Sequence, residues 1–201
     1  MKPLVLFSGG ADSATLLLLL RSDSPLALSF DYGQKHRVEL DYARRFARHH
    51  AIEHRVLPLP GAIFGASALL GDMPMPEGHY TEATMRDTVV PNRNMVMLAL
   101  GASFALRLGR DTVAYAAHAD DHGTYPDCRP AFIAAMREAF ALCHYEPLRL
   151  LTPFSHLGKR DIVKIGRELG IDYSMTWSCY AGGSEPCGRC GACSARREAM
   201  A

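Results

Sequence analysis

The stretch Val5-Leu-Phe-Ser-Gly-Gly-Ala-Asp-Ser-Ala-Thr-Leu-Leu-Leu-Leu-Leu20 decides the fold. Its first three residues are apolar and predict the end of a short buried strand, and the apolar run from Ala14 to Leu20 predicts a helix. Between them, Gly9 and Gly10 permit a tight turn that lets the backbone approach a ligand closely. A glycine turn that joins a strand to a helix is typical of the ligand-binding edge of an α/β sheet.

The rest of the chain alternates strands and helices in the same way. Strands are predicted at 26–30, 55–59, 112–116 and 148–151, and helices at 38–50, 95–108, 130–142 and 159–169. This alternation predicts an α/β fold with a doubly wound, mostly parallel sheet, formed by a single nucleotide-binding domain over 1–201. Residues 60–91 are rich in proline and glycine and have weak periodicity, which predicts a long functional loop or lid.

The charge of the chain is nearly balanced, with 22 Lys and Arg residues against 21 Asp and Glu residues. This balance argues against a large nucleic-acid-binding surface, so no nucleic-acid partner is expected. The N-terminal apolar run is too short for a signal peptide, and no run is long enough to span a membrane. We therefore expect a cytoplasmic protein without a membrane partner, and a homodimer stays open.

Four cysteines lie close together near the C-terminus: Cys179, Cys187, Cys190 and Cys193. Four soft thiolates on glycine-rich connections are typical of a closed tetrahedral Zn²⁺ site, which is structural because no position is left for a catalytic water. We therefore predict a zinc-binding segment at 175–197 with one Zn²⁺ per chain. Of the two remaining cysteines, Cys143 is expected to be buried in a helix, and Cys128 is either an ordinary loop residue or a nucleophile.

The glycine turn has the composition of a phosphate-binding loop. Backbone N–H groups at a helix start face an anion, and two serine hydroxyls add donors. The loop lacks the lysine of a Walker A motif and is not the G-x-G-x-x-G motif of dinucleotide-binding folds. A loop that holds pyrophosphate as it leaves the α-phosphorus favours adenylation over transfer of the γ-phosphoryl group. The candidate residues are Ser8, Gly9, Gly10, Ala11, Asp12 and Ser13.

The motif Ser-Gly-Gly-x-Asp-Ser after the first strand resembles the N-type ATP pyrophosphatases, which have an adenine-nucleotide alpha-hydrolase-like fold. Further segments narrow the resemblance: DYGQKH at 31–36, VPNRN at 90–94, YPDCR at 125–129 and the cysteine run. Together they resemble the 7-cyano-7-deazaguanine synthase family of the queuosine-precursor pathway, over residues 4–197. The family commonly has glycine where Asn92 stands, which is a mild departure.

This resemblance implies an ATP-dependent carbon–nitrogen ligase with small-molecule substrates. The carboxylate of 7-carboxy-7-deazaguanine is adenylated by ATP, which arrives with Mg²⁺, and ammonia displaces AMP to give an amide. A second adenylation, of the amide oxygen, and the loss of AMP then give the nitrile of 7-cyano-7-deazaguanine. The cysteines match the zinc ligands of the family.

The resemblance also implies roles for individual residues. Tyr32, Gly33, Gln34 and Lys35 match the segment that holds ATP beyond the phosphate loop. Lys159, Asp127 and Arg93 match catalytic positions, and Asp127 is expected to accept hydrogen bonds from the guanine-like N–H edge. The substrate side is completed by Asn94, Tyr125, Pro126 and Arg129.

Several alternatives stay open at this point. The enzyme could stop at the amide, or transfer the activated deazaguanine to another acceptor. Two further hypotheses are an RNA sulfur transferase on the same scaffold and a zinc-binding interaction module with an inactive nucleotide fold. His118, Asp120, Asp121 and His122 form either a second metal site or a solvated loop.

Overall fold

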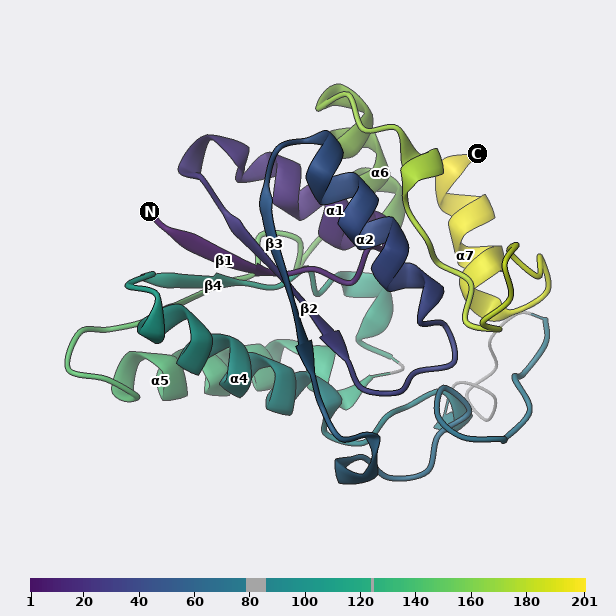
Figure 1. Cartoon of the computed structure of the whole chain (residues 1–201), viewed down its shortest axis with the longest axis horizontal. Coiled ribbons are helices and arrows are strands. Elements are labelled where there is room, and N and C mark those ends of the chain that lie inside the picture. The colour runs from purple at the N-terminus through teal and green to yellow at the C-terminus, as the bar shows by residue number, and fades with distance from the viewer. Residues whose placement is uncertain (79–85, 124) are drawn as a thin grey trace.

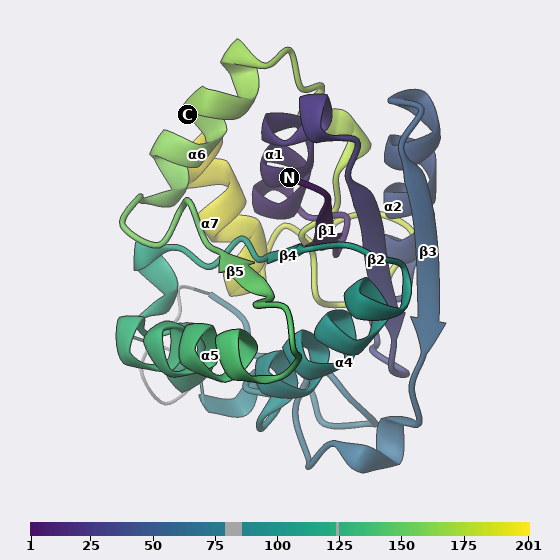
Figure 2. The same cartoon turned by 90° about the vertical axis from the view of Figure 1, so that its left-hand side faces the viewer.

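The computed structural model describes residues 1–78, 86–123 and 125–201. Five parallel strands form one sheet in the order β3-β2-β1-β4-β5 (Figures 1 and 2, with β5 labelled in Figure 2). The strands are β1 (Pro3–Leu6), β2 (Leu26–Asp31), β3 (Glu53–Pro58), β4 (Thr112–Ala114) and β5 (Arg149–Leu151). This arrangement confirms the predicted α/β fold with a parallel, doubly wound sheet.

Helices cover both faces of the sheet, as Figures 1 and 2 show. One face carries α1 (Ala11–Leu19), α2 (Val38–His49) and α6 (Lys159–Glu168), and the other carries α4 (Arg93–Arg107) and α5 (Pro130–Leu142). Two apolar cores result, one on each side of the sheet. Phe7, Phe46 and Phe154 are buried in the first, and Leu28 and Leu98 are buried in the second.

The chain reverses its direction of travel across the sheet between β1 and β4. From β1 it runs outward through β2 to β3, and then returns to β4 on the other side of β1. Ligands of open parallel sheets bind at such a switch point, outside the carboxyl ends of the strands. Val5 of β1 pairs with Ala27 on one side and with Ala114 on the other, so the loops that follow these strands meet at one edge.

The helix boundaries differ from the sequence predictions in informative ways. α4 begins at Arg93, two residues earlier than predicted, because Asn92 adopts the left-handed conformation (φ 61°) and reverses the chain just before it. Asparagine tolerates this conformation better than most residues, and glycine tolerates it best. A helix that was not predicted, α7 (Gly191–Met200), begins inside the cysteine segment.

Cys143 is exposed, which corrects the expectation that it packs in the core. It follows the last residue of α5, where the chain runs out into solvent, and its neighbours Leu142 and Tyr145 are 82% and 100% exposed. The predicted lid at 60–91 contains the short 3₁₀ helix Gly61–Ile63 and otherwise little regular structure in its described part. Residues 79–85 of that segment lie outside the described residues. Within the described chain, no helix has both the length and the apolar character that a bilayer crossing requires.

Candidate functional site

The phosphate loop connects β1 to the N-terminus of α1 in a compact hydrogen-bonded turn. Gly9 has φ +84°, and a Cβ at this position would lie 2.6 Å from the carbonyl oxygen of Glu39. Only glycine therefore allows the loop to pack against α2. The Ser8 and Ser13 hydroxyls lie 3.1 Å apart, and the Gly10 N–H donates to Ser8 Oγ at 3.2 Å. The first N–H groups of α1 have no partner within the helix and can face an anion.

Lys159 reaches this loop from α6. Its Nζ lies 3.0 Å from Asp12 Oδ2, and its side chain is 21% exposed. Burial alone would lower the pKa of Lys159, but the carboxylates of Asp12 and Asp121 outweigh burial and raise that pKa. The lysine therefore stays cationic beside the phosphate loop. Asp120 Oδ2 accepts the Lys159 backbone N–H at 2.8 Å, so Asp120 caps the start of α6.

His118 lies between two carboxylates of the same polar cluster. Its Nε2 is 3.3 Å from Asp121 Oδ2 and 3.7 Å from Asp12 Oδ2, and its side chain is only 5% exposed. Burial raises the pKa of Asp121. His118 and Asp121 line the pocket with the phosphate loop, whereas Asp120 is exposed, so only part of this segment is a solvated loop. Within the described part of the chain, these side chains do not form a group that is compact enough to hold a metal ion by itself.

A second polar group lies across the pocket, after β2 and at the start of α4. Arg93 donates to Tyr32 Oη at 3.3 Å, and no carboxylate of the described residues lies within ion-pair distance of its guanidinium. Tyr32 is buried, which raises the pKa of its hydroxyl and keeps it neutral. Glu39 and His36 stand nearby on α2 and the turn before it, with His36 Nε2 3.5 Å from Glu39 Oε1. An unpaired arginine in a pocket can bind a carboxylate or a phosphate.

Both polar groups line one pocket of about 240 Å³ at the switch point of the sheet. Apolar side chains from the strand ends and α4 form its walls, including Leu6, Leu28, Phe30 and Met97. Ser178 and Tyr180 of the cysteine segment also line it, together with Trp177. The pocket therefore combines an apolar wall for a flat ring, a cationic end and a phosphate loop.

The structure brings most of the predicted site residues to this pocket. Of the predicted residues, those that line it are Ser8, Gly10, Ala11, Asp12, Ser13, Tyr32, Arg93, Asn94, Tyr125 and Lys159. Gly9 and Gln34 lie behind the wall and support it. Gly33 is exposed, and the Lys35 ammonium donates to the carbonyl oxygen of Met73 in the long loop. The predicted ATP contact of Lys35 stays a prediction.

The YPDCR segment lies mostly behind the pocket wall. Asp127 Oδ2 accepts the backbone N–H of Asn94 at 3.0 Å, so this carboxylate caps the N-terminus of α4. Arg129 donates from Nε to the carbonyl oxygen of His122 at 3.0 Å, and Pro126 begins a 3₁₀ turn. Asp127, Pro126 and Arg129 are not among the residues that line the pocket. The substrate contacts predicted for them stay predictions.

Cys128 lines the pocket, but its environment does not suit a nucleophile. Its Sγ lies 3.2 Å from Tyr115 Oη and accepts from Asn94 Nδ2 at 3.4 Å. Burial raises the pKa of the Cys128 thiol to about 12. Because the thiolate is the reactive form, this environment disfavours a nucleophilic role for Cys128.

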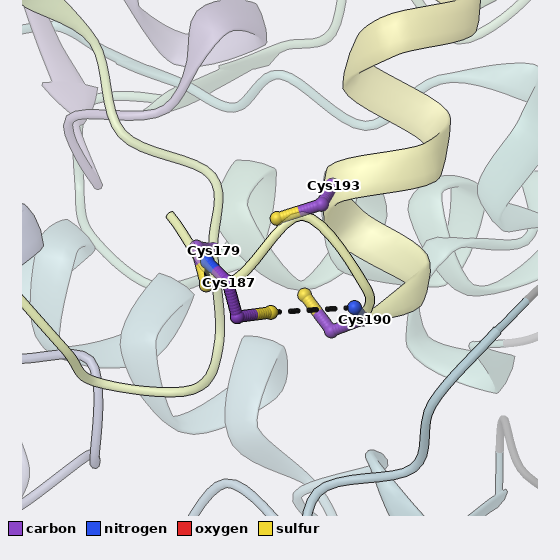
Figure 3. A group of neighbouring side chains, drawn as sticks. All are labelled: Cys179, Cys187, Cys190 and Cys193. Carbon is purple, nitrogen blue, oxygen red and sulfur yellow. Dashed lines mark hydrogen bonds between the residues drawn. The ribbon is translucent and has the colours of Figure 1, made fainter. Parts of the chain in front are cut away.

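The four clustered cysteines converge on one point (Figure 3). Their sulfur atoms all lie within 4.8 Å of one another, as ligands of a single ion must. A tetrahedral Zn²⁺ with bonds of about 2.3 Å places its sulfur ligands about 3.8 Å apart. Backbone N–H groups of Ala181 and Cys187 donate to Cys179 Sγ, and those of Arg189 and Cys190 donate to Cys187 Sγ, at 3.3–3.4 Å. Such N–H donors stabilise thiolates, so the cluster fits one metal ion.

The cysteine segment contacts four other parts of the chain: the phosphate loop, α2, the long loop and the turn after β2. The Trp177 N–H donates to the Gly9 carbonyl oxygen at 2.9 Å, and the indole of Trp177 lies 5.0 Å from the ring of Tyr42 on α2. The Gly78 N–H donates to the Arg189 carbonyl oxygen at 2.8 Å, which attaches the long loop. Gly182 has φ +77° and packs closely against the backbone of Lys35. A Cβ at position 182 would lie 2.3 Å from the carbonyl oxygen of Lys35.

Comparison with known proteins identifies the family. The family model described as queuosine biosynthesis protein QueC matches residues 2–201. This chain belongs to the QueC family. A relative from Methanoregula boonei, named 7-cyano-7-deazaguanine synthase, is 47% identical over 204 residues and covers 100% of this chain and 94% of its own length. A relative from Pseudoalteromonas atlantica with the same name is 43% identical over 203 residues, with coverage of 99% and 93%.

Solved structures that resemble this QueC-family chain confirm the fold. The U34-tRNA thiolase NcsA from Methanococcus maripaludis has a TM-score of 0.55 and 16% identity, and the match covers 99% of this chain and 64% of that one. The NH3-dependent NAD synthetase from Campylobacter jejuni has a TM-score of 0.51 and 14% identity, with coverage of 87% and 66%. At these identities the likeness shows the adenine-nucleotide alpha-hydrolase-like fold alone.

Some pocket residues of this QueC-family chain were not predicted as site residues. Glu39, His36 and Tyr180 line the pocket, as do His118 and Asp121, whose role the sequence left open. Glu39 stands in the first turn of a helix, where an acidic residue is ordinary because it complements the helix dipole. His36 belongs to the DYGQKH segment, so its place in that motif was the one available signal.

Proposed function

We propose that this chain is an ATP-dependent carbon–nitrogen ligase that converts 7-carboxy-7-deazaguanine and ammonia to 7-cyano-7-deazaguanine. The observation that carries the proposal is the phosphate loop with Lys159 at the switch point, in one pocket with Arg93, whose guanidinium has no ion-pair partner among the described residues. Membership of the QueC family and relatives that bear the name 7-cyano-7-deazaguanine synthase support it.

The reaction requires two activations. A carboxylate oxygen attacks the α-phosphorus of ATP, and the bond to pyrophosphate breaks. Ammonia then adds to the acyl carbon, loses a proton and expels AMP, which leaves an amide. The amide oxygen attacks a second ATP in the same way, and loss of AMP and of the remaining nitrogen protons gives the nitrile. Each activation turns an oxygen that leaves poorly into part of a good leaving group.

The residues of the pocket suit these steps. The N–H groups of the phosphate loop and the Ser8 and Ser13 hydroxyls hold the phosphates, and Lys159 neutralises the negative charge that develops on pyrophosphate. Arg93 holds the substrate carboxylate beside the α-phosphate, and Tyr32 orients the guanidinium. Mg²⁺ accompanies ATP through its phosphate oxygens. Asn94, with Asp127 behind it, holds the start of α4 on the substrate side.

The four cysteines hold one Zn²⁺, which is structural in this proposal. Four thiolates complete a tetrahedral site and leave no open position, so the ion supplies no chemistry to the reaction. Its contribution is to fix the segment that carries Trp177, Ser178 and Tyr180 over the pocket. We place the zinc-binding segment 175–197 within a single domain that spans residues 1–201, because Trp177 bonds to the phosphate loop itself.

A product assay tests the proposal. The zinc-loaded protein is incubated with 7-carboxy-7-deazaguanine, Mg²⁺-ATP and isotope-labelled ammonium, and the products are weighed by mass spectrometry. A nitrile that carries one labelled nitrogen is the expected product. An amide as the end product, or no turnover at all, contradicts the proposal.

A further inference from the structure

Glu39 is a pocket carboxylate that the phosphate loop does not use. It stands in the first turn of α2, lines the pocket, and its side chain is 12% exposed. The same pocket is lined by the apolar side chains of Leu28, Phe30 and Leu40, which suit a flat ring. A carboxylate beside such a wall can read the N–H edge of a base.

Gln34 fixes the orientation of this carboxylate. The Gln34 side-chain oxygen accepts the backbone N–H of Tyr32 at 2.9 Å, so its amide nitrogen must point the other way. That nitrogen donates to the Phe30 carbonyl oxygen at 3.1 Å and to Glu39 Oε1 at 2.9 Å. Among the described residues, Glu39 Oε2 makes no hydrogen bond. One carboxylate oxygen is thereby held by the protein, and the other remains available to a ligand.

Apart from His36, no basic side chain of the described residues lies within ion-pair distance of Glu39, and Arg93 acts on it only from a longer distance. Burial raises the pKa of Glu39 to about 7, and burial lowers the pKa of His36 to about 3, so His36 is neutral. His36 Nε2 can therefore approach Glu39 Oε1 only as the N–H of a neutral imidazole. In that tautomer Nδ1 is an acceptor, and this buried atom has no hydrogen-bond partner among the described residues. Glu39 Oε2 and His36 Nδ1 thus have no hydrogen-bond partner among the described residues, and both residues line the pocket, so a ligand with several N–H donors can supply the missing donors.

We infer that Glu39 recognises the guanine-like edge of the substrate by accepting hydrogen bonds from its ring N1–H and its 2-amino group. This inference rests on the proposed function. The free Oε2 has two lone pairs and can accept from two adjacent donors, and a guanine-type base presents such a pair on its Watson–Crick edge. Adenine presents one donor beside an acceptor, and the lone pair of that acceptor would face a carboxylate oxygen. Glu39 therefore selects the deazaguanine substrate and not the adenine of ATP.

Asp127 was the sequence-based candidate for this contact, and its position favours Glu39 instead. The Asp127 carboxylate is engaged with the Asn94 N–H, and it does not line the pocket. Glu39 has the free carboxylate oxygen that base recognition needs.

Glu39→Gln provides a sharp test, because Gln34 dictates how the new amide must point. The Gln34 amide nitrogen is a donor, so it holds the oxygen of Gln in E39Q and turns the new NH2 group toward the ligand. The new NH2 group, which is a donor, then faces the N–H donors of the substrate and cannot bond to them. We expect the KM for 7-carboxy-7-deazaguanine to rise by about 10- to 100-fold, and the KM for ATP to change by less than about 3-fold. Asp41→Asn, an exposed change on the same helix, is the matched control and should alter neither value.

A substrate analogue without the 2-amino group completes a double-mutant cycle with the zinc-loaded enzyme. The wild-type enzyme should bind this analogue about 10-fold more weakly than the parent compound, whereas E39Q should discriminate by less than about 3-fold. Equal discrimination by both enzymes overturns the inference, and so does a rise in the KM for ATP alone. A merely structural role of Glu39 would not change discrimination between the two ligands.

The outcomes separate this inference from the proposed function. Wild-type protein that forms no nitrile from 7-carboxy-7-deazaguanine refutes the proposed function, and the inference fails with it. Wild-type protein that forms nitrile, together with an E39Q variant that keeps the wild-type KM for both substrates, refutes the role of Glu39 alone. Thermal melting of both proteins establishes that E39Q is folded.

Discussion

The backbone N–H of Trp177 donates a hydrogen bond to the carbonyl oxygen of Gly9 at 2.9 Å. Trp177 lies two residues before the first cysteine of the cluster, and Gly9 lies in the middle of the phosphate loop. The indole N–H of Trp177 bonds in turn to the Cys179 carbonyl oxygen at 2.7 Å. Two hydrogen bonds of Trp177 therefore connect the metal-binding Cys179 to the phosphate loop, whose backbone would hold pyrophosphate.

Cys190→Ser should couple loss of metal to loss of nucleotide binding. The variant removes one of four ligands, and metal-binding free energy contributes directly to folding. We expect the zinc content to fall from one per chain to near zero and the melting temperature to fall by roughly 10 °C. Binding of ATP, measured by calorimetry, should weaken as the Trp177 contact loosens.

The control for this experiment is Cys143→Ser, because Cys143 is exposed and lies outside the cluster. It should keep the metal, the melting temperature and ATP binding. A Cys190→Ser protein that retains full zinc and melts like the wild type would show that the ligand assignment is wrong.

Lys159→Gln should lower turnover with little effect on folding. The ammonium lies 3.0 Å from Asp12 and faces the phosphate loop, where charge develops as pyrophosphate leaves. Loss of one such electrostatic contact typically lowers kcat by about 100- to 1,000-fold. Lys164→Gln, an exposed change on the same helix, should leave the rate unchanged. Steady-state release of AMP measures both, and similar rates for the two variants would refute the role of Lys159.

Glu39→Gln should stabilise the protein at high pH. The folded-state pKa of Glu39 is raised to about 7 by burial, so the stability it confers is complete below the unfolded pKa and is lost as pH rises toward 7. E39Q cannot ionise and does not lose this stability. The free energy of unfolding of E39Q relative to wild type should therefore increase by roughly 1–3 kcal/mol between pH 5 and pH 8.

Urea unfolding of both proteins at the two pH values measures this difference. The comparison of E39Q with wild type cancels effects of pH on the cysteine cluster that both proteins share. A constant difference across the range would mean that Glu39 titrates at its ordinary pKa. A residue whose removal raises stability but weakens substrate binding is typical of a functional site.

Asp127→Ala should destabilise the N-terminus of α4. The carboxylate accepts the Asn94 N–H at 3.0 Å, and loss of such a cap typically lowers the free energy of unfolding by about 1 kcal/mol. Asp127→Asn keeps an oxygen acceptor and should retain more than half of this stability. Urea unfolding measures both variants, and equal losses would show that charge, not the hydrogen bond, is what Asp127 supplies.

Much of the fold could be predicted from the sequence because its signals are local. Val5–Phe7, the Gly9–Gly10 turn and the apolar run to Leu20 reveal a strand, a turn and a helix without reference to the rest of the chain. The helix α7 was missed because it starts among the glycines and cysteines of the metal segment. Its order comes from Arg196, which donates to Thr176 and Ser178 and so depends on tertiary contacts.

The site was predictable only where residue type and place in the chain both indicate chemistry. The phosphate loop and the cysteines meet that condition, whereas Glu39 does not, because the role that we infer for it depends on its contact with Gln34. His118 was ambiguous for the same reason, since its sequence neighbours are polar and its burial arises from contact with Asp12 of another element. Asp127 is the opposite case. It matches a motif and was predicted to bind substrate, but its carboxylate accepts the Asn94 N–H at the start of α4.

The ratio of AMP to nitrile tests the central claim most directly. The zinc-loaded protein is supplied with limiting 7-carboxy-7-deazaguanine, excess Mg²⁺-ATP and ammonium, and both products are quantified at completion. Two successive adenylations predict two AMP for every nitrile, with pyrophosphate equal to AMP. One AMP for every deazaguanine consumed with an amide as product, or ATP consumption that releases ADP and phosphate, would contradict the account.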